Sequence, residues 1–212
     1  MSQKGIFVVF EGVEGCGKST VIKWLSEKLQ SEGYGIYLTR EPGGKGSDLA
    51  ESIRQLILNP ENNVYPETEA YLFAASRAQH VKEVIAPHIE KGEIVLCDRF
   101  VHSSLAYQGV GRKLGQDQVN NINQLAIGKY WPDIIVLLDL DPVIGLGRKE
   151  EGHMSKDRID SEVMSFHQTI RGAYLKMASE DDRFIIVDAS QNLEKVKDDV
   201  YRLLIEKIKT WK

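Results

Sequence analysis

The chain has 212 residues, of which 42% are hydrophobic and 27% are charged, and its formal net charge at pH 7 is -4. This length predicts one domain over residues 1–212, and the composition excludes a disordered chain. The acidic balance argues against a general nucleic-acid-binding surface. No apolar run approaches the roughly 20 residues that a bilayer requires, and the N-terminal apolar run is shorter than we expect of a signal peptide. We therefore expect a cytoplasmic protein with no membrane partner, in which Cys16 and Cys97 are reduced thiols.

Short apolar runs rich in β-branched residues alternate with segments of helical composition. Such runs are typical of strands in a buried parallel sheet, apolar on both faces. The predicted strands are residues 6–10, 36–39, 94–97, 134–140 and 184–188. The predicted helices are residues 20–32, 47–58, 67–90, 116–128, 160–179 and 193–210. This alternation predicts an α/β fold, a three-layer sandwich with a central parallel sheet and helices on both faces.

Two segments lack this alternation. Residues 109–115, GVGRKLG, are predicted to form a glycine-rich loop. Residues 148–158, RKEEGHMSKDR, are polar and highly charged without apolar periodicity. On its residues alone, the second segment fits a solvated helix end as well as it fits a functional loop.

A phosphate-binding sequence follows the first predicted strand. Residues 12–19, GVEGCGKS, match G-x-x-x-x-G-K-[ST] between a strand and a helix. The glycines let several backbone N–H groups and a helix N-terminus point at one anion. Lys18 is expected to be an exposed charge for the β and γ phosphates, and the Ser19 hydroxyl can join a Mg²⁺ shell. We predict a nucleoside triphosphate site formed by Gly12, Val13, Glu14, Gly15, Cys16, Gly17, Lys18, Ser19 and Thr20.

This loop does not identify the phosphate acceptor. A GTPase switch is one class, but the sequence contains neither N-K-x-D nor D-x-x-G. A mechanical ATPase is another, but the length leaves no room for a second functional domain. A small-molecule kinase requires an acceptor pocket opposite the loop.

Arginines near the ends of predicted strands suggest such a pocket, because open α/β sheets bind ligands there. A guanidinium can bind phosphate through two hydrogen bonds, although a lone surface arginine is more often a salt-bridge partner. The candidates are Arg40 in TREPGG, Arg77 in FAASR and Arg99 in DRF. Asp98 follows the strand 94–97, as expected for a carboxylate that positions Mg²⁺, and it would also serve as a helix N-cap.

Together these motifs resemble the thymidylate kinase family, which transfers the γ-phosphate of ATP to dTMP. The motifs keep the family's order and spacing over nearly the whole chain. They are EGVEGCGKST (11–20), TREPGG (39–44), LFAASRAQH (72–80), DRFVHSSLAYQGVGR (98–112), DRID (157–160) and VDAS (187–190). The resemblance implies Mg²⁺ as cofactor, ATP and dTMP as partners, dTDP as product and a homodimer. A kinase for another nucleoside monophosphate, or a nucleotide-binding switch or ATPase, stays open as an alternative.

The resemblance also implies roles for single residues. Phe73 matches the ring that stacks on thymine, although a helical phenylalanine is by default a core residue, and Tyr107 matches the ring against the sugar's 2′ carbon. Polar contacts at the base are implied for Arg77, Ser104 and Gln108. Contacts with the acceptor phosphate are implied for Arg40 and Arg99.

Members of the family carry a catalytic arginine either in the phosphate loop or on a lid. The loop here contains Glu14 and no arginine, so the chain resembles the bacterial type with a lid arginine, and residues 148–158 become a predicted short mobile lid. Glu14 is then expected to bind the 3′-hydroxyl of dTMP, with pairing to a nearby arginine as the alternative. Catalytic roles are implied for Lys18, Arg99, Arg148 and Arg158. The sequence leaves open which lid cation reaches the transferred phosphate.

Overall fold

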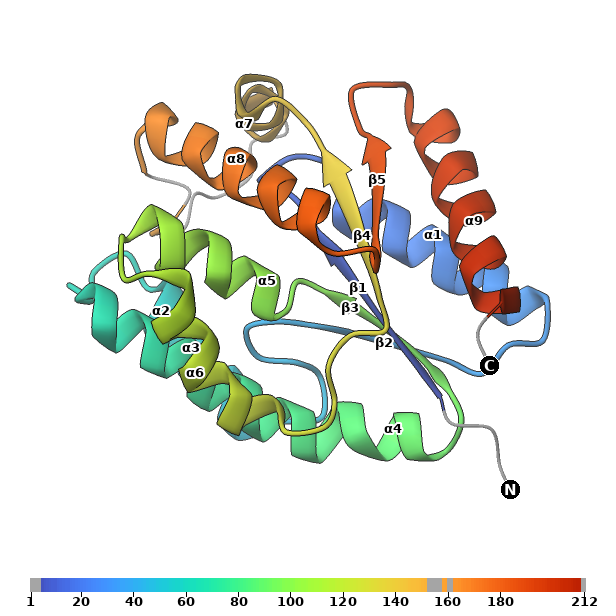
Figure 1. The fold of residues 1–212 in the computed structure, drawn as a ribbon, viewed down its shortest axis with the longest axis horizontal. Helices are drawn as coiled ribbons and strands as arrows, with labels where there is room; N and C mark the ends of the chain where they lie inside the picture. Colours follow the sequence, from blue (N-terminus) through green and yellow to red (C-terminus); the bar gives the residue numbers. More distant parts are fainter. Residues whose placement is uncertain (1–4, 152–157, 160–161, 211–212) are drawn as a thin grey trace.

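The computed structural model describes residues 5–151, 158–159 and 162–210. Within these residues the chain forms one sheet of five parallel strands in the order β2-β3-β1-β4-β5 (Figure 1). The strands are β1 (Ile6–Glu11), β2 (Ile36–Arg40), β3 (Ile94–Asp98), β4 (Ile134–Asp139) and β5 (Phe184–Asp188). All five were predicted within one residue at each end, and the predicted α/β class with a parallel sheet is confirmed.

Helices cover both faces of the sheet (Figure 1). Before β4 the helical elements are α1 (Lys18–Ser31), α2 (Asp48–Leu58), α3 (Pro66–His80), the π-helical turn η1 (Val81–Ile85), α4 (Ala86–Glu90), α5 (Val101–Ser104), the π-helical η2 (Leu105–Gly111) and α6 (Gln116–Ile127). After β4 they are α7 (Pro142–Glu151), α8 (Met164–Glu180) and α9 (Leu193–Thr210). No helix in this described part of the chain is long and apolar enough to cross a membrane.

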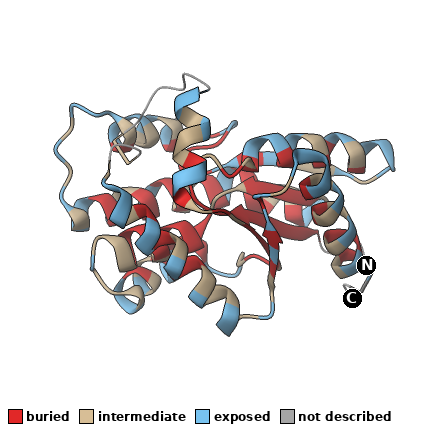
Figure 2. Cartoon of the chain, turned by 90° about the horizontal axis from the view of Figure 1, so that it is seen from above, coloured by how far each residue is buried: buried red, intermediate tan, exposed pale blue. Residues whose placement is uncertain are grey.

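The alternation of side chains along β1 divides the core between the two faces. Val8 and Phe10 pack with α1 and α9 in one cluster. Phe7 and Val9 point to the other face and pack with η1, α4 and the start of α5 in a second cluster. The inner strands appear continuously buried in Figure 2, and each residue of β1 is buried on its own side.

The prediction that all five strands are apolar and buried on both faces is wrong for the two edge strands. Leu38 of β2 is 41% exposed and Ile186 of β5 is 49% exposed. Each edge strand has a neighbour on one side only, and the flanking helices cover the middle of the sheet. Apolar composition alone therefore does not distinguish a central strand from an edge strand.

The glycine-rich segment 109–115 begins as a helix and not as a loop. Gly109 and Gly111 lie in η2, which packs against α8. A β-carbon at Gly111 would lie 2.6 Å from the ring of Phe166 and 2.8 Å from Ile170. Gly111 therefore permits close packing of two helices, which a sequence pattern cannot distinguish from turn formation.

The segment predicted as a lid starts inside a helix. Residues 148–151 are the last turn of α7, a helix that the sequence analysis did not predict, whereas residues 152–157 lie outside the described residues. A β-carbon on Gly145 would come 2.1 Å from the backbone oxygen of Glu14. The close contact made possible by Gly145 holds the base of the predicted lid directly beside the phosphate loop.

Candidate active site

The predicted phosphate loop connects β1 to α1 at the carboxyl edge of the sheet. Gly17 precedes the helix with φ of 91°, a left-handed conformation that favours glycine. The Lys18 ammonium donates hydrogen bonds of 3.0 Å to the backbone oxygens of Gly12 and Val13. Lys18 is only 7% exposed, so the expectation that it is an exposed charge is wrong. The loop itself holds the ammonium group in a fixed position.

A cavity of about 400 Å³, which we call the loop cavity, opens in front of this loop. Its cations outnumber its carboxylates, as binding of a polyphosphate requires. It is lined by Glu14, Gly15, Gly17, Lys18, Ser19, Thr20, Arg54, Asp98, Arg99, Arg148 and Lys149.

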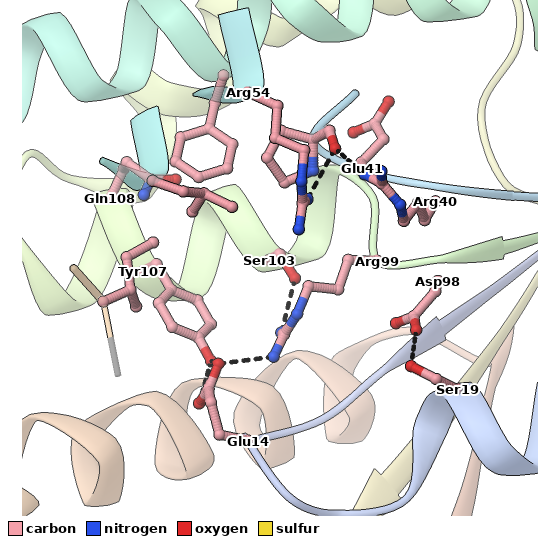
Figure 3. A pocket seen from close by; sticks show the side chains of 14 residues that line it. Glu14, Ser19, Arg40, Glu41, Arg54, Asp98, Arg99, Ser103, Tyr107 and Gln108 are labelled. Atoms are coloured by element: carbon pink, nitrogen blue, oxygen red, sulfur yellow. Dashed lines mark hydrogen bonds and ion pairs between the residues drawn. The ribbon is translucent and has the colours of Figure 1, made fainter. Parts of the chain in front are cut away.

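Ser19 and Asp98 meet at the rim of the loop cavity. The Ser19 hydroxyl donates a 2.6 Å hydrogen bond to a carboxylate oxygen of Asp98, as Figure 3 shows. A hydroxyl and one carboxylate beside a phosphate site fit Mg²⁺, which takes oxygen ligands and obtains the rest from phosphates and water. Within the described ranges no group of three His, Cys, Asp or Glu side chains could hold a metal without such help.

A second cavity of about 210 Å³, which we call the deep cavity, adjoins the loop cavity and shares part of its lining, and Figure 3 shows the side chains around it. Apolar walls and a few polar groups line it, as in other small-molecule sites. Its own lining residues are Arg40, Glu41, Pro42, Leu58, Phe73, Ser103, Tyr107, Gln108 and Ile159. The two cavities share Glu14, Ser19, Arg54, Asp98 and Arg99.

Glu14 lies at the boundary between the two cavities. Its carboxylate accepts a 2.7 Å hydrogen bond from Arg99 and 2.8 Å contacts from the Tyr107 hydroxyl, and His167 lies 3.5 Å away. Burial alone would raise the pKa of Glu14, but the charge of Arg99 and the hydrogen bond from His167 outweigh burial and lower it well below its usual range. Glu14 is therefore ionised at neutral pH, and it makes the arginine pairing that the sequence left as an alternative.

Arg99 reaches this boundary from the end of β3. Its backbone has φ of 68°, left-handed and unusual for a residue with a β-carbon, and its N–H donates to the Phe10 oxygen at 2.9 Å. The guanidinium donates to Glu14 and, at 3.2 and 3.3 Å, to the hydroxyls of Ser103 and Tyr174. The turn after the strand thus directs a cation to the wall that both cavities share.

Arg40 and Arg54 also line the deep cavity. Both donate to the backbone oxygen of Pro42 at 2.9 Å, and Arg40 also pairs with Glu51 at 2.9 Å. The sequence analysis missed Arg54, because an arginine on the amphipathic helix α2 is normally interpreted as a solvated residue. Its position in the cavity becomes visible only once the fold brings Arg54 to the backbone oxygen of Pro42.

Phe73, Tyr107 and Gln108 line the deep cavity, whereas Arg77 and Ser104 do not, and the substrate contacts of the first three stay predictions. Arg77 is 1% exposed and donates to Glu41 at 2.7 Å and to Ser104 at 3.1 Å. It also bonds Asn123 and the Phe100 oxygen. This network lies behind the wall of the cavity, and the contacts of Arg77 and Ser104 with a base stay predictions.

The structure separates the two predicted lid arginines. Arg148 lines the loop cavity, and its guanidinium donates to the Ala189 oxygen at 3.3 Å. Arg158 instead donates to the Ile57 oxygen at 3.1 Å and to the Glu69 carboxylate, and it lines neither the loop cavity nor the deep cavity. Of these two arginines, Arg148 is the one placed where it could approach a phosphate in the loop cavity, and Lys149 beside it lines the same cavity.

Several buried side chains that support the site carry no sequence signal. Glu11 is fully buried and accepts hydrogen bonds from Ser103 and Tyr174, and burial raises the pKa of its carboxyl. Its partners lie 92 and 163 residues away, so no local pattern joins them. Both cysteines are buried and free, as predicted.

Comparison with known proteins identifies the group to which this geometry belongs. The family model described as thymidylate kinase matches residues 10–200. A thymidylate kinase of Bacillus pumilus is 45% identical over 208 residues, covering 97% of each chain. Thymidylate kinases of Enterococcus faecalis and of a Geobacillus species are each 47% identical, covering 96% and 91% of this chain and 97% and 92% of their own. The chain belongs to the thymidylate kinase family.

Proposed function

We propose that the chain transfers the γ-phosphate of ATP to dTMP, giving ADP and dTDP. Family membership supports the reaction, and one structural observation carries it for this chain: a phosphate-loop cavity and a second, deep cavity share a wall of Glu14, Ser19, Arg54, Asp98 and Arg99. Two nucleotides bound in the two cavities would bring their phosphates together at that wall. Neither a switch nor a simple ATPase needs the deep cavity.

The loop cavity takes the donor in this proposal. Lys18 and the loop N–H groups hold the β and γ phosphates of ATP. Ser19 and Asp98 would hold Mg²⁺, which neutralises charge on the phosphates when it is bound. The other residues of the loop, from Gly12 to Thr20, shape this cradle.

The deep cavity takes the acceptor. Arg99 and Arg40 hold the acceptor phosphate, and Arg54, which lines the same cavity, joins them in this role. Phe73 stacks on the base, and Gln108 contacts its polar edge. Arg77 and Ser104 lie behind the residues that line the deep cavity and hold them in place. Their contacts with the edge of the base stay predictions.

The protein needs to form no covalent bond with the substrates in this reaction. An oxygen of the dTMP phosphate attacks the γ-phosphorus in line, and the bond to the ADP oxygen breaks. The protein contributes alignment of the two phosphates and cations around the transferred group. A lid at residues 148–158, bearing Arg148, would exclude water from that group, and the whole chain would act as one cytoplasmic kinase domain.

An acceptor panel tests this proposal. With ATP and Mg²⁺, we expect rapid ADP release with dTMP, and little release with dGMP, CMP or no acceptor. Coupled spectrophotometry measures the rate and mass analysis identifies dTDP. Faster release with dGMP or CMP would assign the chain to another acceptor, and release without any acceptor would assign it to the ATPase class.

The position of Glu14 leads to a prediction on sugar recognition. Its carboxylate already accepts hydrogen bonds from Arg99 and Tyr107. An ionised carboxylate can accept about four hydrogen bonds in all, so Glu14 can also accept one from the 3′-hydroxyl of dTMP. We expect Glu14→Ala and 3′-deoxy-dTMP each to lower kcat/KM, with losses that are markedly less than additive when combined. A steady-state cycle over the four enzyme–acceptor pairs measures this, and additive losses would assign Glu14 to arginine pairing alone.

We also propose a homodimer formed through the layer of α2, α3 and α6. These helices pack on one another and expose large apolar side chains that a monomer would leave in water. They are Leu49, Leu56, Tyr71 and Leu125, the last of which is 91% exposed. Light scattering should give a dimer mass that Leu125→Glu halves and that Leu193→Glu, at an exposed position at the start of α9, does not. A monomeric unaltered chain would refute the interface.

A further inference from the structure

Glu69 is a buried carboxylate next to the deep cavity that the sequence motifs do not include. It lies in the first turn of α3 and is 1% exposed. Arg158 donates to one of its oxygens, and Arg112 lies 3.4 Å from the other. Two guanidinium groups therefore pair with this buried carboxylate, as the burial of a charged group requires.

Gln108 is a further partner of Glu69. The Gln108 amide nitrogen donates a 2.7 Å hydrogen bond to the same Glu69 oxygen that faces Arg112. The Glu69 oxygens accept hydrogen bonds from Arg112 and Arg158, so the reverse orientation of the Gln108 amide would place two acceptors against each other. Glu69 therefore determines which way the Gln108 amide faces.

The consequence is a buried acceptor at the wall of the deep cavity. Gln108 lines that cavity and is 1% exposed. Its carboxamide oxygen has no hydrogen-bond partner in the part of the chain that the structure describes. A buried carbonyl left without a donor costs free energy, so a ligand group that donates to it is favoured over one that cannot.

We propose that Glu69 is a specificity-determining residue, which selects bases with a donor N–H at position 3 by locking the Gln108 amide. This inference rests on the proposed function. Thymine and uracil carry a hydrogen on N3, which can donate to the Gln108 oxygen. Cytosine has a lone pair at N3, and two acceptors would then face each other. Glu69 acts through Gln108 and is a positioning residue.

The test uses Glu69→Gln in the full-length chain. A glutamine at position 69 can donate as well as accept, so the Gln108 amide is released to rotate. We expect the ratio of kcat/KM for dTMP to that for dCMP to fall about tenfold, in line with the cost of one unpaired buried polar group. The ratio for dTMP to dUMP should not change, because both bases carry the N3 hydrogen.

Glu67→Gln is the matched control, since Glu67 lies on the same helix, is exposed and loses the same charge. It should leave both ratios unchanged. In a Gln108→Leu background, which has no amide to orient, Glu69→Gln should no longer move the dTMP to dCMP ratio.

The outcomes separate this inference from the proposed function. If the unaltered chain prefers an acceptor other than dTMP or dUMP, the proposed function itself fails. If the unaltered chain is specific for dTMP but Glu69→Gln lowers kcat/KM equally for dTMP and dCMP, Glu69 is only structural and the inference is overturned. An unchanged ratio in a folded Glu69→Gln protein, checked by its melting temperature, overturns it as well.

Discussion

Replacement of Lys18 by methionine is expected to lower kcat/KM with ATP about a hundredfold or more, because a positioned cation on the β and γ phosphates is lost. Methionine keeps most of the apolar stem, and the stem of Lys18 is buried. The change also removes the two hydrogen bonds to Gly12 and Val13, so the loop loses part of its internal support. Initial rates over a range of ATP concentrations measure the loss.

Lys23→Met is the matched control for this prediction. Lys23 lies one turn further along α1 and is exposed, so the same change of charge occurs without contact with either cavity. It should leave kcat/KM within about twofold, since surface substitutions rarely have larger effects. Near-normal turnover by a Lys18→Met protein with an unaltered melting temperature would contradict the assignment of the loop cavity as the ATP site.

The strands and most helices could be predicted because their signal is local. Apolar runs and helical spacing are properties of consecutive residues, and all five strands were found from them. The partial exposure of the edge strands β2 and β5 was not predicted, since exposure depends on the order of the strands in the sheet. The helical start of residues 109–115 was missed for a related reason: Gly111 accommodates Phe166 of α8, a residue far along the chain.

The site divides in the same way. The phosphate loop is contiguous, and its residues were predicted from a motif whose physical basis is local. The support of the deep cavity is not contiguous, because Gln108 lies 39 residues from Glu69 and Glu11 lies 163 residues from Tyr174. A buried carboxylate without a motif resembles any surface carboxylate in the sequence. Such residues become interpretable only when the fold brings their partners together.

The predicted lid contains two arginines that are close in the sequence but lie apart in the fold. Arg148 and Arg158 stand ten positions apart in one charged segment. Arg148 lies in the last turn of α7, a helix that contacts the phosphate loop through Gly145, whereas Arg158 donates hydrogen bonds to Ile57 and Glu69. Because the two arginines have different neighbours, we expect different roles for them. Arg148 should act on the transferred phosphate, and Arg158 should support Glu69.

These positions lead to the second large prediction. We expect Arg148→Met to lower kcat at least about a hundredfold, because an arginine beside the transferred group stabilises charge that develops only in the transition state. KM for both nucleotides should change much less, since an interaction made only in the transition state contributes nothing to ground-state binding. Single-turnover kinetics with saturating ATP and dTMP would measure the chemical step directly.

Two further variants make the result specific. Arg202→Met removes an exposed arginine on α9, whose side chain is 65% exposed, and should leave kcat unchanged. Arg158→Met should lower kcat less than Arg148→Met and should instead reduce discrimination between dTMP and dCMP, because Arg158 contacts Glu69 and not the loop cavity. A larger loss of kcat for Arg158→Met than for Arg148→Met would reverse the assignment. It would mean that Arg158 leaves Glu69 during turnover and reaches the phosphate, so that the contacts of Arg158 described here belong to a conformation other than the reactive one.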